Sequence, residues 1–411
     1  MAQMDEPSLR KNAKKEQVEN GSALRSQLAP IVFLTALFFL NFTARIILSP
    51  LIPTIEKDMG LGHGEMGSFF LLITIGYFVS LVGSGFISSR ISHRLTIIVS
   101  AVAIGLVLFS VYFAETAWGI SACMLVLGLV TGIYLPSGIA TITHLVNPRQ
   151  WGKAIAIHEL APSLGFVLAP LVAEALMIWF SWRGVMATIG FVSILAGICF
   201  ISFGRGGEFT GEKPNFDSIR SLLRKPSFWV MVVLFSMGIS STVGTYSMLP
   251  LYLVADHGIL RVEANTLVAI SRISTLFIVF LAGWAADRFG ATRIMKAVFL
   301  ITGIMTILLG LANTSWINLI VLLQPVFAVC FFPAGFALLS LIVPPQNRGL
   351  AVSLAIPVGF MIGAGLVPTG IGFLGDAGQF KLGFILLGVF ILSGSILLRF
   401  VRLRDHTGKV L

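Results

Sequence analysis

Charged residues are scarce in this chain of 411 residues, since only 11% are Asp, Glu, Lys or Arg while 56% are hydrophobic. A soluble globular domain carries about 25% charged residues. A soluble fold of this length could not hide so much apolar surface, whereas a lipid bilayer solvates it directly. The shortage of charge therefore excludes an ordinary soluble protein and predicts a membrane protein.

Cysteine is also rare, and Cys123, Cys199 and Cys330 fall inside apolar runs without a CxxC spacing. We interpret them as small buried hydrophobic residues, so we expect no disulfide framework, no metal site and no cofactor. A G-x-x-x-x-G-K-[ST] motif is missing, which leaves direct coupling to ATP unsupported. The histidines are scattered along the chain without a cluster of acids, so we expect no enzyme.

Long apolar runs dominate what is present, and a spanning helix needs about 20 such residues. Twelve runs qualify, which predicts an all-α membrane protein with twelve transmembrane helices. The runs lie near 30–53, 65–88, 95–114, 118–146, 153–179, 185–204, 228–254, 265–286, 295–313, 316–343, 350–374 and 382–401.

The basic residues give an orientation, because cytoplasmic loops hold an excess of Lys and Arg. Most of the 28 basic residues fall on the side of the chain termini. The opposite side receives only Lys57, Arg183, Arg261 and Lys381. We therefore expect a multi-pass protein of a bacterial inner membrane with both termini in the cytoplasm. Charge spread over short loops in this way does not suit a nucleic-acid binder, despite the net charge of +10.

The polar stretches divide the chain into five parts, and the longest connection joins six helices to six helices. Within that connection, Ser218 to Arg224 could form a short amphipathic helix on the inner leaflet. The predicted parts are a disordered cytoplasmic tail at 1–29, a bundle at 30–204, a cytoplasmic linker at 205–227, a second bundle at 228–401 and a cytoplasmic tail at 402–411.

The two halves are related by an internal repeat. At a constant offset, residues 135–154 (LPSGIATITHLVNPRQWGKA) align with 332–351 (FPAGFALLSLIVPPQNRGLA). The segments 85–94 (GFISSRISHR) and 283–293 (GWAADRFGATR) also correspond. Repeats of this kind are common in transporters and predict two homologous six-helix bundles.

The loop Gly283-x-x-x-Asp287-Arg288-x-Gly290 resembles the signature loop of the major facilitator superfamily. The resemblance extends from about residue 30 to residue 400, and it implies two bundles around a central cavity in a protein that works as a monomer. It also implies that Gly283, Asp287 and Arg288 act in gating, together with Arg90 in the first-half copy. That copy is degraded, because Ser89 stands where the family usually has Asp.

Two arginines lie inside predicted helices, Arg45 in the first and Arg272 in the eighth. Both lie about 10–12 Å below the surface opposite the termini, from a rise of about 1.5 Å per residue. No Asp or Glu lies at that depth in any apolar run. The pair predicts a binding site for an anion, since guanidinium groups pair bidentately with carboxylate or phosphate. The alternative is that each arginine only braces neighbouring helices.

Other polar residues within the apolar runs are candidates for substrate binding or for packing between helices. Tyr134 and Tyr246 precede prolines, where a broken helix frees backbone groups beside a cavity. The full set of such candidates is Asn41, Tyr77, Tyr134, Tyr246 and Gln324.

His158 and Glu159 are adjacent in the fifth helix and could take up and release a proton near neutral pH. The alternative is that both are solvated at the cytoplasmic mouth. Glu174 lies near the other end of the same helix and is interpreted as an interfacial charge.

The arrangement Asn41-x-x-x-Arg45 followed by Ser49-Pro50 resembles the first helix of anion:cation symporters and organophosphate antiporters. Arg272 is similar to the arginine that holds carboxylate in monocarboxylate and oxalate carriers. We therefore predict a secondary transporter of a small organic anion, such as a carboxylate, that works by alternating access with proton symport or anion exchange. The rival prediction is a proton-driven efflux pump for drugs or metabolites, although that class usually carries a lone buried acid.

Overall fold

The computed structural model describes residues 24–211, 216–343 and 348–401. Within these ranges, twelve helical segments are long and apolar enough to cross a membrane, which confirms the predicted number. The first six spans are Leu24–Met59, His63–Ser88, His93–Phe113, Ala117–Leu145, Pro148–Met177 and Trp182–Phe203. The second six are Pro226–Ala255, Arg261–Phe289, Ala291–Leu311, Ile317–Ile342, Leu350–Asp376 and Phe380–Phe400.

Several spans consist of two or three consecutive helices. The first half contains η1 (Leu24–Gln27), α2 (Leu28–Ile46), α3 (Leu48–Met59), α4 (His63–Ser88), α5 (His93–Phe113), α6 (Ala117–Gly132), α7 (Tyr134–Leu145), η2 (Pro148–Gln150), α8 (Trp151–His158), α9 (Leu160–Met177) and α10 (Trp182–Phe203). The second half contains α12 (Pro226–Ile239), η3 (Ser240–Gly244), α13 (Thr245–Ala255), α14 (Arg261–Ile273), α15 (Thr275–Phe289), α16 (Ala291–Leu311), α17 (Ile317–Ala328), α18 (Phe331–Ile342), α19 (Arg348–Phe360), η5 (Met361–Leu366), α20 (Val367–Asp376), α21 (Phe380–Leu397) and η6 (Leu398–Phe400).

The ends of the observed spans differ from the predicted ends by several residues. The first span begins at Leu24, inside the stretch that we assigned to the tail, and continues to Met59. The linker contains α11 (Phe216–Leu223), close to the short helix expected there. The predicted tails at 1–23 and 402–411 lie outside the described residues. The five-part division of the chain stays a prediction.

Prolines explain most breaks within the spans. A proline has no N–H, so the carbonyl four residues before it loses its helical partner. The interruptions fall directly at or after such carbonyls, and those at Ile133 and at Cys330 occupy equivalent positions of the internal repeat. The break positions and their prolines are Ile47 with Pro50, Ile133 with Pro136, Glu159 with Pro162, and Val329–Cys330 with Pro333.

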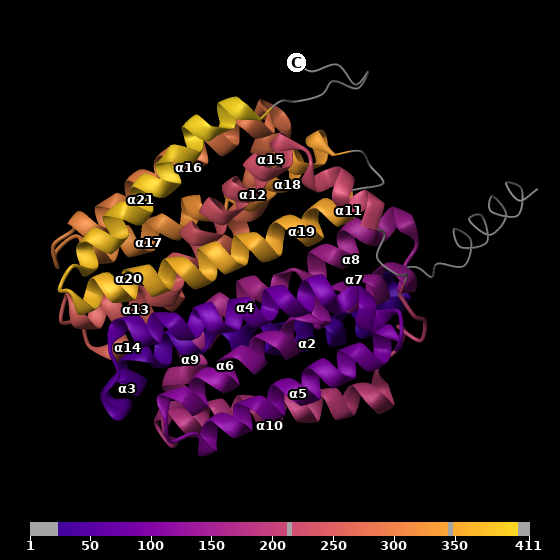
Figure 1. Ribbon diagram of the computed structural model, residues 1–411, viewed down its shortest axis with the longest axis horizontal. Coiled ribbons are helices and arrows are strands. Elements are labelled where there is room, and N and C mark those ends of the chain that lie inside the picture. The colour runs from indigo at the N-terminus through magenta and orange to yellow at the C-terminus, as the bar shows by residue number, and fades with distance from the viewer. Residues whose placement is uncertain (1–23, 212–215, 344–347, 402–411) are drawn as a thin grey trace, which may run out of the picture.

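The two six-helix halves lie side by side, the first in indigo to magenta and the second in orange to yellow (Figure 1). Leu24 donates its N–H to Gln150 Oε1 at 2.7 Å, so the start of the first span meets the turn between α7 and α8. We call the end of the molecule with Leu24 and Val401 the terminal end. The opposite end, with the turns at Gly60 and Gly378, is the distal end.

Hydrogen bonds join the two halves toward the distal end. Ser49 Oγ donates to the carbonyl of Tyr246 at 2.8 Å, and this carbonyl is the one that Pro250 leaves without a helical partner. Thr369 Oγ1 donates to Gly67 O at 3.0 Å. These buried contacts close the distal end between the halves.

An ionic contact adds to this closure. The Asp376 carboxylate, at the end of α20, accepts the backbone N–H groups of His63 at 2.6 Å and Gly64 at 2.9 Å. Those N–H groups begin α4, where the helix dipole favours a negative charge. In a second charged contact between the halves, Arg261 of α14 pairs with Glu174 of α9 at 2.9 Å. Glu174 is therefore part of a contact between the halves and not merely an interfacial charge.

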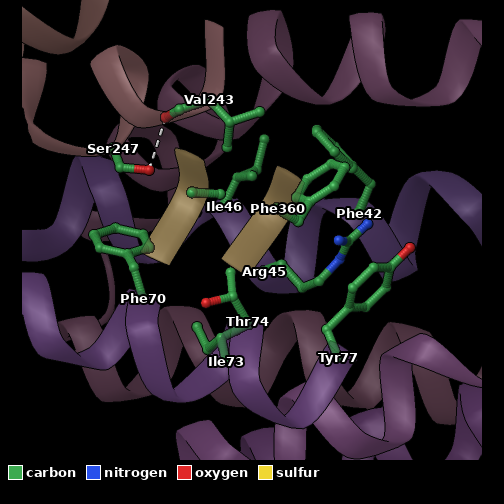
Figure 2. Close-up of a pocket in the computed structure, with 11 residues that line it drawn as sticks. Phe42, Arg45, Ile46, Phe70, Ile73, Thr74, Tyr77, Val243, Ser247 and Phe360 are labelled. Carbon is green, nitrogen blue, oxygen red and sulfur yellow. Dashed lines mark hydrogen bonds between the residues drawn. The ribbon is translucent and has the colours of Figure 1, made fainter. Parts of the chain in front are cut away.

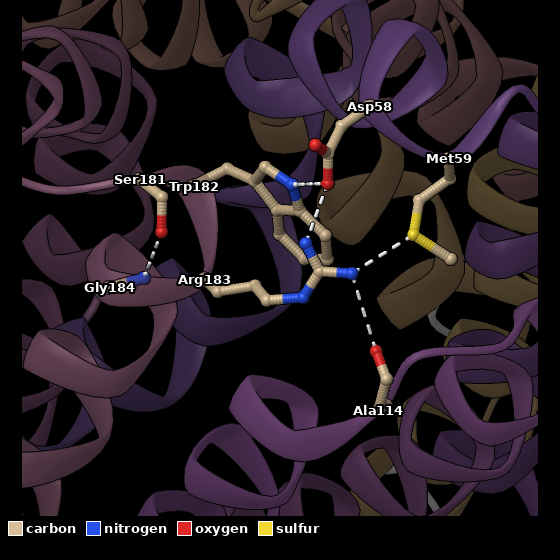
Figure 3. Close-up of polar contacts among 7 residues, drawn as sticks. All are labelled: Asp58, Met59, Ala114, Ser181, Trp182, Arg183 and Gly184. Carbon is tan, nitrogen blue, oxygen red and sulfur yellow. Dashed lines mark hydrogen bonds and ion pairs between the residues drawn. The ribbon is translucent and has the colours of Figure 1, made fainter.

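A separate cluster of polar contacts joins two helices at the distal end of the first half (Figure 3). Asp58 accepts from Trp182 Nε1 at 2.9 Å and from Arg183 at 2.6 Å. The Arg183 guanidinium also lies 4.2 Å from the Trp182 ring. Because these contacts join α3 to α10, they stabilise the first bundle.

Candidate functional site: a pair of buried arginines

Arg45 projects from the end of α2 into the space between the two halves, where it is 8% exposed. Its guanidinium carbon lies 4.4 Å from the Tyr77 ring, 5.1 Å from the Phe42 ring and 5.7 Å from the Phe360 ring (Figure 2). Its Nε is buried without a hydrogen-bond partner. Within the described part of the chain, no ion pair involves Arg45.

The side chains around Arg45 leave a small pocket that is lined by both halves. Phe42, Thr74 and Tyr77 come from the first half, while Ser247 and Phe360 come from the second. The open volume is about 20 Å³, which is close to the space that one water molecule needs. A ligand larger than water therefore fits beside the guanidinium only if the walls separate.

Arg272 ends α14 and is 3% exposed. Its Nη2 donates to the carbonyl of Thr242 at 3.2 Å. The guanidinium lies 5.0 Å from the Phe166 ring and 5.3 Å from the Tyr246 ring. Both Arg272 Nε and the Tyr246 hydroxyl are buried without a hydrogen-bond partner, and Arg272 belongs to no ion pair among the described residues.

Two aromatic side chains bridge the arginines. The Phe42 ring, beside Arg45, lies 5.1 Å from the Phe166 ring, which is beside Arg272. The Phe166 ring contacts the Tyr246 ring at 4.8 Å. The Phe42 and Phe166 rings thus connect the surroundings of the two guanidinium groups. As the sequence predicted, each half contributes one of the two arginines.

The helix next to Arg272 is locally widened. Residues Ser240–Gly244 form the π-helical segment η3, and a second π-helical segment, η5, packs against it. Gln324 Nε2 donates to Ser241 O at 2.8 Å, while Arg272 donates to Thr242 O. Two of the predicted polar residues therefore satisfy carbonyls of η3. Such segments often occur at functional sites.

The structure brings Tyr77 to Arg45 and Tyr246 to Arg272, but it places two other candidates elsewhere. Asn41 donates to Thr131 O at 3.0 Å, which joins α2 to α6 inside the first half. The Tyr134 hydroxyl contacts His158 Nε2 at 3.2 Å. Asn41 is therefore held by a contact between helices, and Tyr134 belongs to a second polar cluster with His158 and Glu159.

The signature-loop residues lie at the terminal end. Asp287 and Arg288 are exposed in the last turn of α15, which ends at Gly290 with a φ of 91°. Gly283 lies closest to the Pro333 ring of α18, and Arg90 is exposed. No ion pair of Asp287, Arg288 or Arg90 occurs in the described ranges, so their gating role stays a prediction.

Sequence reasoning missed the aromatic members of the site. Phe42 could have been found, because it lies three residues before Arg45 and thus on the same face of the helix. Phe166 and Phe360 carry no such signal, since 33 phenylalanines are spread through the chain. Only the packing of α9 and α19 shows that these two rings contact the arginines.

The model of the Major Facilitator Superfamily matches residues 34–271 and 245–410 of this chain. The chain belongs to this superfamily. Membership confirms the resemblance of the signature loop and makes the protein a transporter and not an enzyme.

Relatives of this superfamily member include transporters named for anions. It is 22% identical over 408 residues to the probable L-galactonate transporter of Escherichia coli (strain K12), a match that spans 90% of this chain and 88% of that protein. It is 23% identical over 313 residues to the probable nitrate/nitrite transporter NarK2 of Mycobacterium tuberculosis, over 74% of each chain.

Solved structures share the fold. A bacterial homolog of the human lysosomal transporter Spinster, in an inward-facing and occupied conformation, superposes with a TM-score of 0.78 at 16% identity, over 93% of this chain and 97% of that chain. A D-xylose-proton symporter gives a TM-score of 0.75, also at 16% identity, over 93% and 99% of the two chains. The fold prediction of two six-helix bundles is confirmed.

Proposed function

We propose that this protein is a secondary transporter that moves a small organic anion across a bacterial inner membrane by alternating access. Arg45 and Arg272 would bind the anion, with Tyr77 and Tyr246 beside them. The observation that carries the proposal is the burial of two guanidinium groups that have no carboxylate partner among the described residues. The relatives named for L-galactonate and for nitrate agree with an anionic substrate.

Donors without a partner favour a ligand over a purely structural role. A buried ion that lacks a partner costs about 3–5 kcal/mol, and each aromatic contact offsets about 0.5–2 kcal/mol. The three rings at Arg45, and the two rings and the carbonyl at Arg272, therefore offset a cost of this size. The Nε atoms of both arginines still lack an acceptor, and an anion would supply it.

The closed distal end supports alternating access. The halves meet through Ser49, Thr369 and Asp376, which lie on the distal side of the arginines in their spans. We propose that the terminal end faces the cytoplasm, as the distribution of basic residues predicts, and that the protein works as a monomer. An efflux pump for cationic drugs is the rival, but the buried charges here are basic.

The test is ligand-induced thermal stabilisation of the purified protein. Probes are nitrate, formate, L-galactonate, a sugar phosphate and a cationic drug, because they cover the rival substrate classes. A ligand at about 100 times its Kd stabilises the folded state by about 2.7 kcal/mol. We expect one of the anions to raise the melting temperature of the wild type, and neither Arg45→Ala nor Arg272→Ala to respond.

Arg183→Ala is the matched control, since this arginine already pairs with Asp58 at 2.6 Å. It should keep the response of the wild type to the anion. Stabilisation by the drug alone, or an anion response that survives in both Arg45→Ala and Arg272→Ala, would refute the arginine site.

A further inference from the structure

A second polar cluster lies in the first half, and the anion site does not use it. His158 ends α8, and its side chain is fully buried. Tyr134 from α7 contacts its Nε2 at 3.2 Å, and Glu159 contacts its Nδ1 at 3.2 Å. The Tyr134 hydroxyl also lies 2.7 Å from the carbonyl of Leu34 in α2.

These three contacts need three protons. A carbonyl accepts only, so the Tyr134 proton must point to Leu34 O, because two bare oxygens would repel at 2.7 Å. The Tyr134 oxygen is then an acceptor, and His158 must donate from Nε2. In a neutral imidazole the other nitrogen carries no proton. The contact between Nδ1 and the Glu159 carboxylate therefore requires one more proton.

The surroundings place this proton on the imidazole, because the Glu159 side chain is 47% exposed and water solvates its ionised form. His158 is then an imidazolium that donates from both nitrogens, and Glu159 is its counter-ion. The Phe38 ring lies parallel to the imidazole at 4.4 Å with an interplanar angle of 2°. An aromatic face stabilises a cation at this position.

The surroundings leave Glu159 as the exchangeable partner. From α7 the titratable group that faces His158 is Tyr134, from α2 the neighbour is the non-titratable Phe38, and from the start of α9 it is Glu159. The Glu159 side chain is 47% exposed while that of His158 is fully buried. Glu159 can therefore pass a proton between water and the imidazole.

The cluster lies at a helix break and contacts the helix that carries Arg45. Pro162 leaves the carbonyl of His158 without its helical partner, and the helix is broken at Glu159. Phe38 and the Leu34 carbonyl belong to α2, the helix that carries Arg45. Loss of the third proton would set Nδ1 against a carboxylate, both of them acceptors, and would release Glu159 from the contact.

We propose that His158 and Glu159 form the proton-binding site of this transporter and that one proton bound there is carried with the anion. The coupling of proton and anion rests on the proposed transport of anions. The binding of a proton at His158 and Glu159 does not depend on that transport. The two parts are therefore tested separately.

The proton itself is tested without any anion, on protein labelled with ¹⁵N at its 6 histidines. His158→Gln assigns the signals of His158. We expect both ring nitrogens of His158 to carry a proton in the wild type, as the three contacts require. In Glu159→Gln the amide can donate to Nδ1, so His158 should become neutral and protonated at Nε2 only. A neutral His158 in the wild type would overturn the proposal.

Coupling is tested in liposomes with nitrate and L-galactonate as probes. For one proton per monovalent anion, a gradient of about one pH unit drives about tenfold accumulation, equal to about 1.4 kcal/mol. We expect this accumulation in the wild type and its loss in Glu159→Gln, which should still exchange anion for anion. His93→Gln is the control, because His93 is buried against Ser137 at 3.1 Å and pairs with no acid in the part of the chain that the structure describes.

The outcomes separate the two proposals. Accumulation that persists in Glu159→Gln would show that the pair does not couple transport, whatever its protonation. Absence of flux for every probe, combined with an imidazolium at position 158, would count against the anion proposal and leave the proton site supported. A neutral His158 combined with anion flux would count against the proton site and leave the anion proposal supported.

Discussion

The Arg272 side chain and the Tyr246 hydroxyl present unpaired donors next to each other. Tyr246 is fully buried, and its hydroxyl has no partner, whereas buried polar groups are nearly always hydrogen-bonded. Under the proposed function, the partner of this hydroxyl arrives with the anion. The same reasoning applies to the Nε atoms of both arginines.

Tyr246→Phe should therefore leave the free energy of unfolding unchanged or slightly raised, because the lost hydroxyl bonds to nothing in this state. Anion affinity should fall by about 10- to 150-fold, since a hydrogen bond to a charged group contributes about 1.5–3 kcal/mol. Isothermal titration with the stabilising anion measures the affinity, and thermal unfolding measures the stability.

Tyr252→Phe is the matched control, because the Tyr252 hydroxyl is buried and donates to Leu309 O at 2.9 Å. It should lose about 1 kcal/mol of stability and keep its affinity for the anion. If Tyr246→Phe behaves like this control, its hydroxyl has a structural role only.

At the scale of helices, the widened segments η3 and η5 depend on a close approach of their backbones. A Cβ on Gly363 would lie 2.6 Å from Ser240 N and 2.9 Å from Ser236 O. Neither backbone atom can move aside as the end of a flexible side chain would. The carbonyls that Arg272 and Gln324 use are in η3, so this contact also positions the site.

Gly363→Ala should therefore destabilise the protein by about 1–3 kcal/mol, the usual cost of forcing atoms into a filled interior. Gly370→Ala in the adjacent α20 is the control, because a Cβ there would meet nothing within 4 Å. This control should be neutral or stabilising by up to about 1 kcal/mol, since alanine favours a helix. Equal melting temperatures for the two variants would contradict the close contact.

At the scale of the whole molecule, the distal contact between α4 and α20 decides whether the halves can close. A Cβ on Gly67 would lie 2.6 Å from Pro368 O and 2.7 Å from Thr369 Cα, across the interface between the halves. The clash would lie between the halves and not within either bundle, so we expect it to separate the halves before it unfolds either one.

Gly67→Ala should accordingly shift the population toward an open distal end. Spin labels at Lys57→Cys and Ala377→Cys, on opposite halves, report the distance after the three native cysteines are replaced. We expect a longer distance in Gly67→Ala than in the parent protein. Gly83→Ala, on the same helix with nothing within 4 Å of the added Cβ, should keep the parent distribution. An unchanged distance in Gly67→Ala would show that the contact does not control closure.

The sequence by itself determined the number of spans, the two-fold repeat and the positions of most helix breaks. Each of these depends on local chemistry. Apolar length decides whether a segment spans a bilayer, and a proline removes one hydrogen bond wherever it stands. The depth of Arg45 and Arg272 in opposite halves follows in the same way from residue counts along each helix.

Only the tertiary structure decided which side chains meet. Lipid and protein neighbours are equally apolar, so the hydrophobic pattern of a span says little about which face turns inward. The aromatic bridge from Phe42 to Phe166, the contact of Tyr134 with His158 and the packing of η3 on η5 all depend on helix rotation and close approach. Sequence alone therefore located the charges of this transporter, and packing determined their partners.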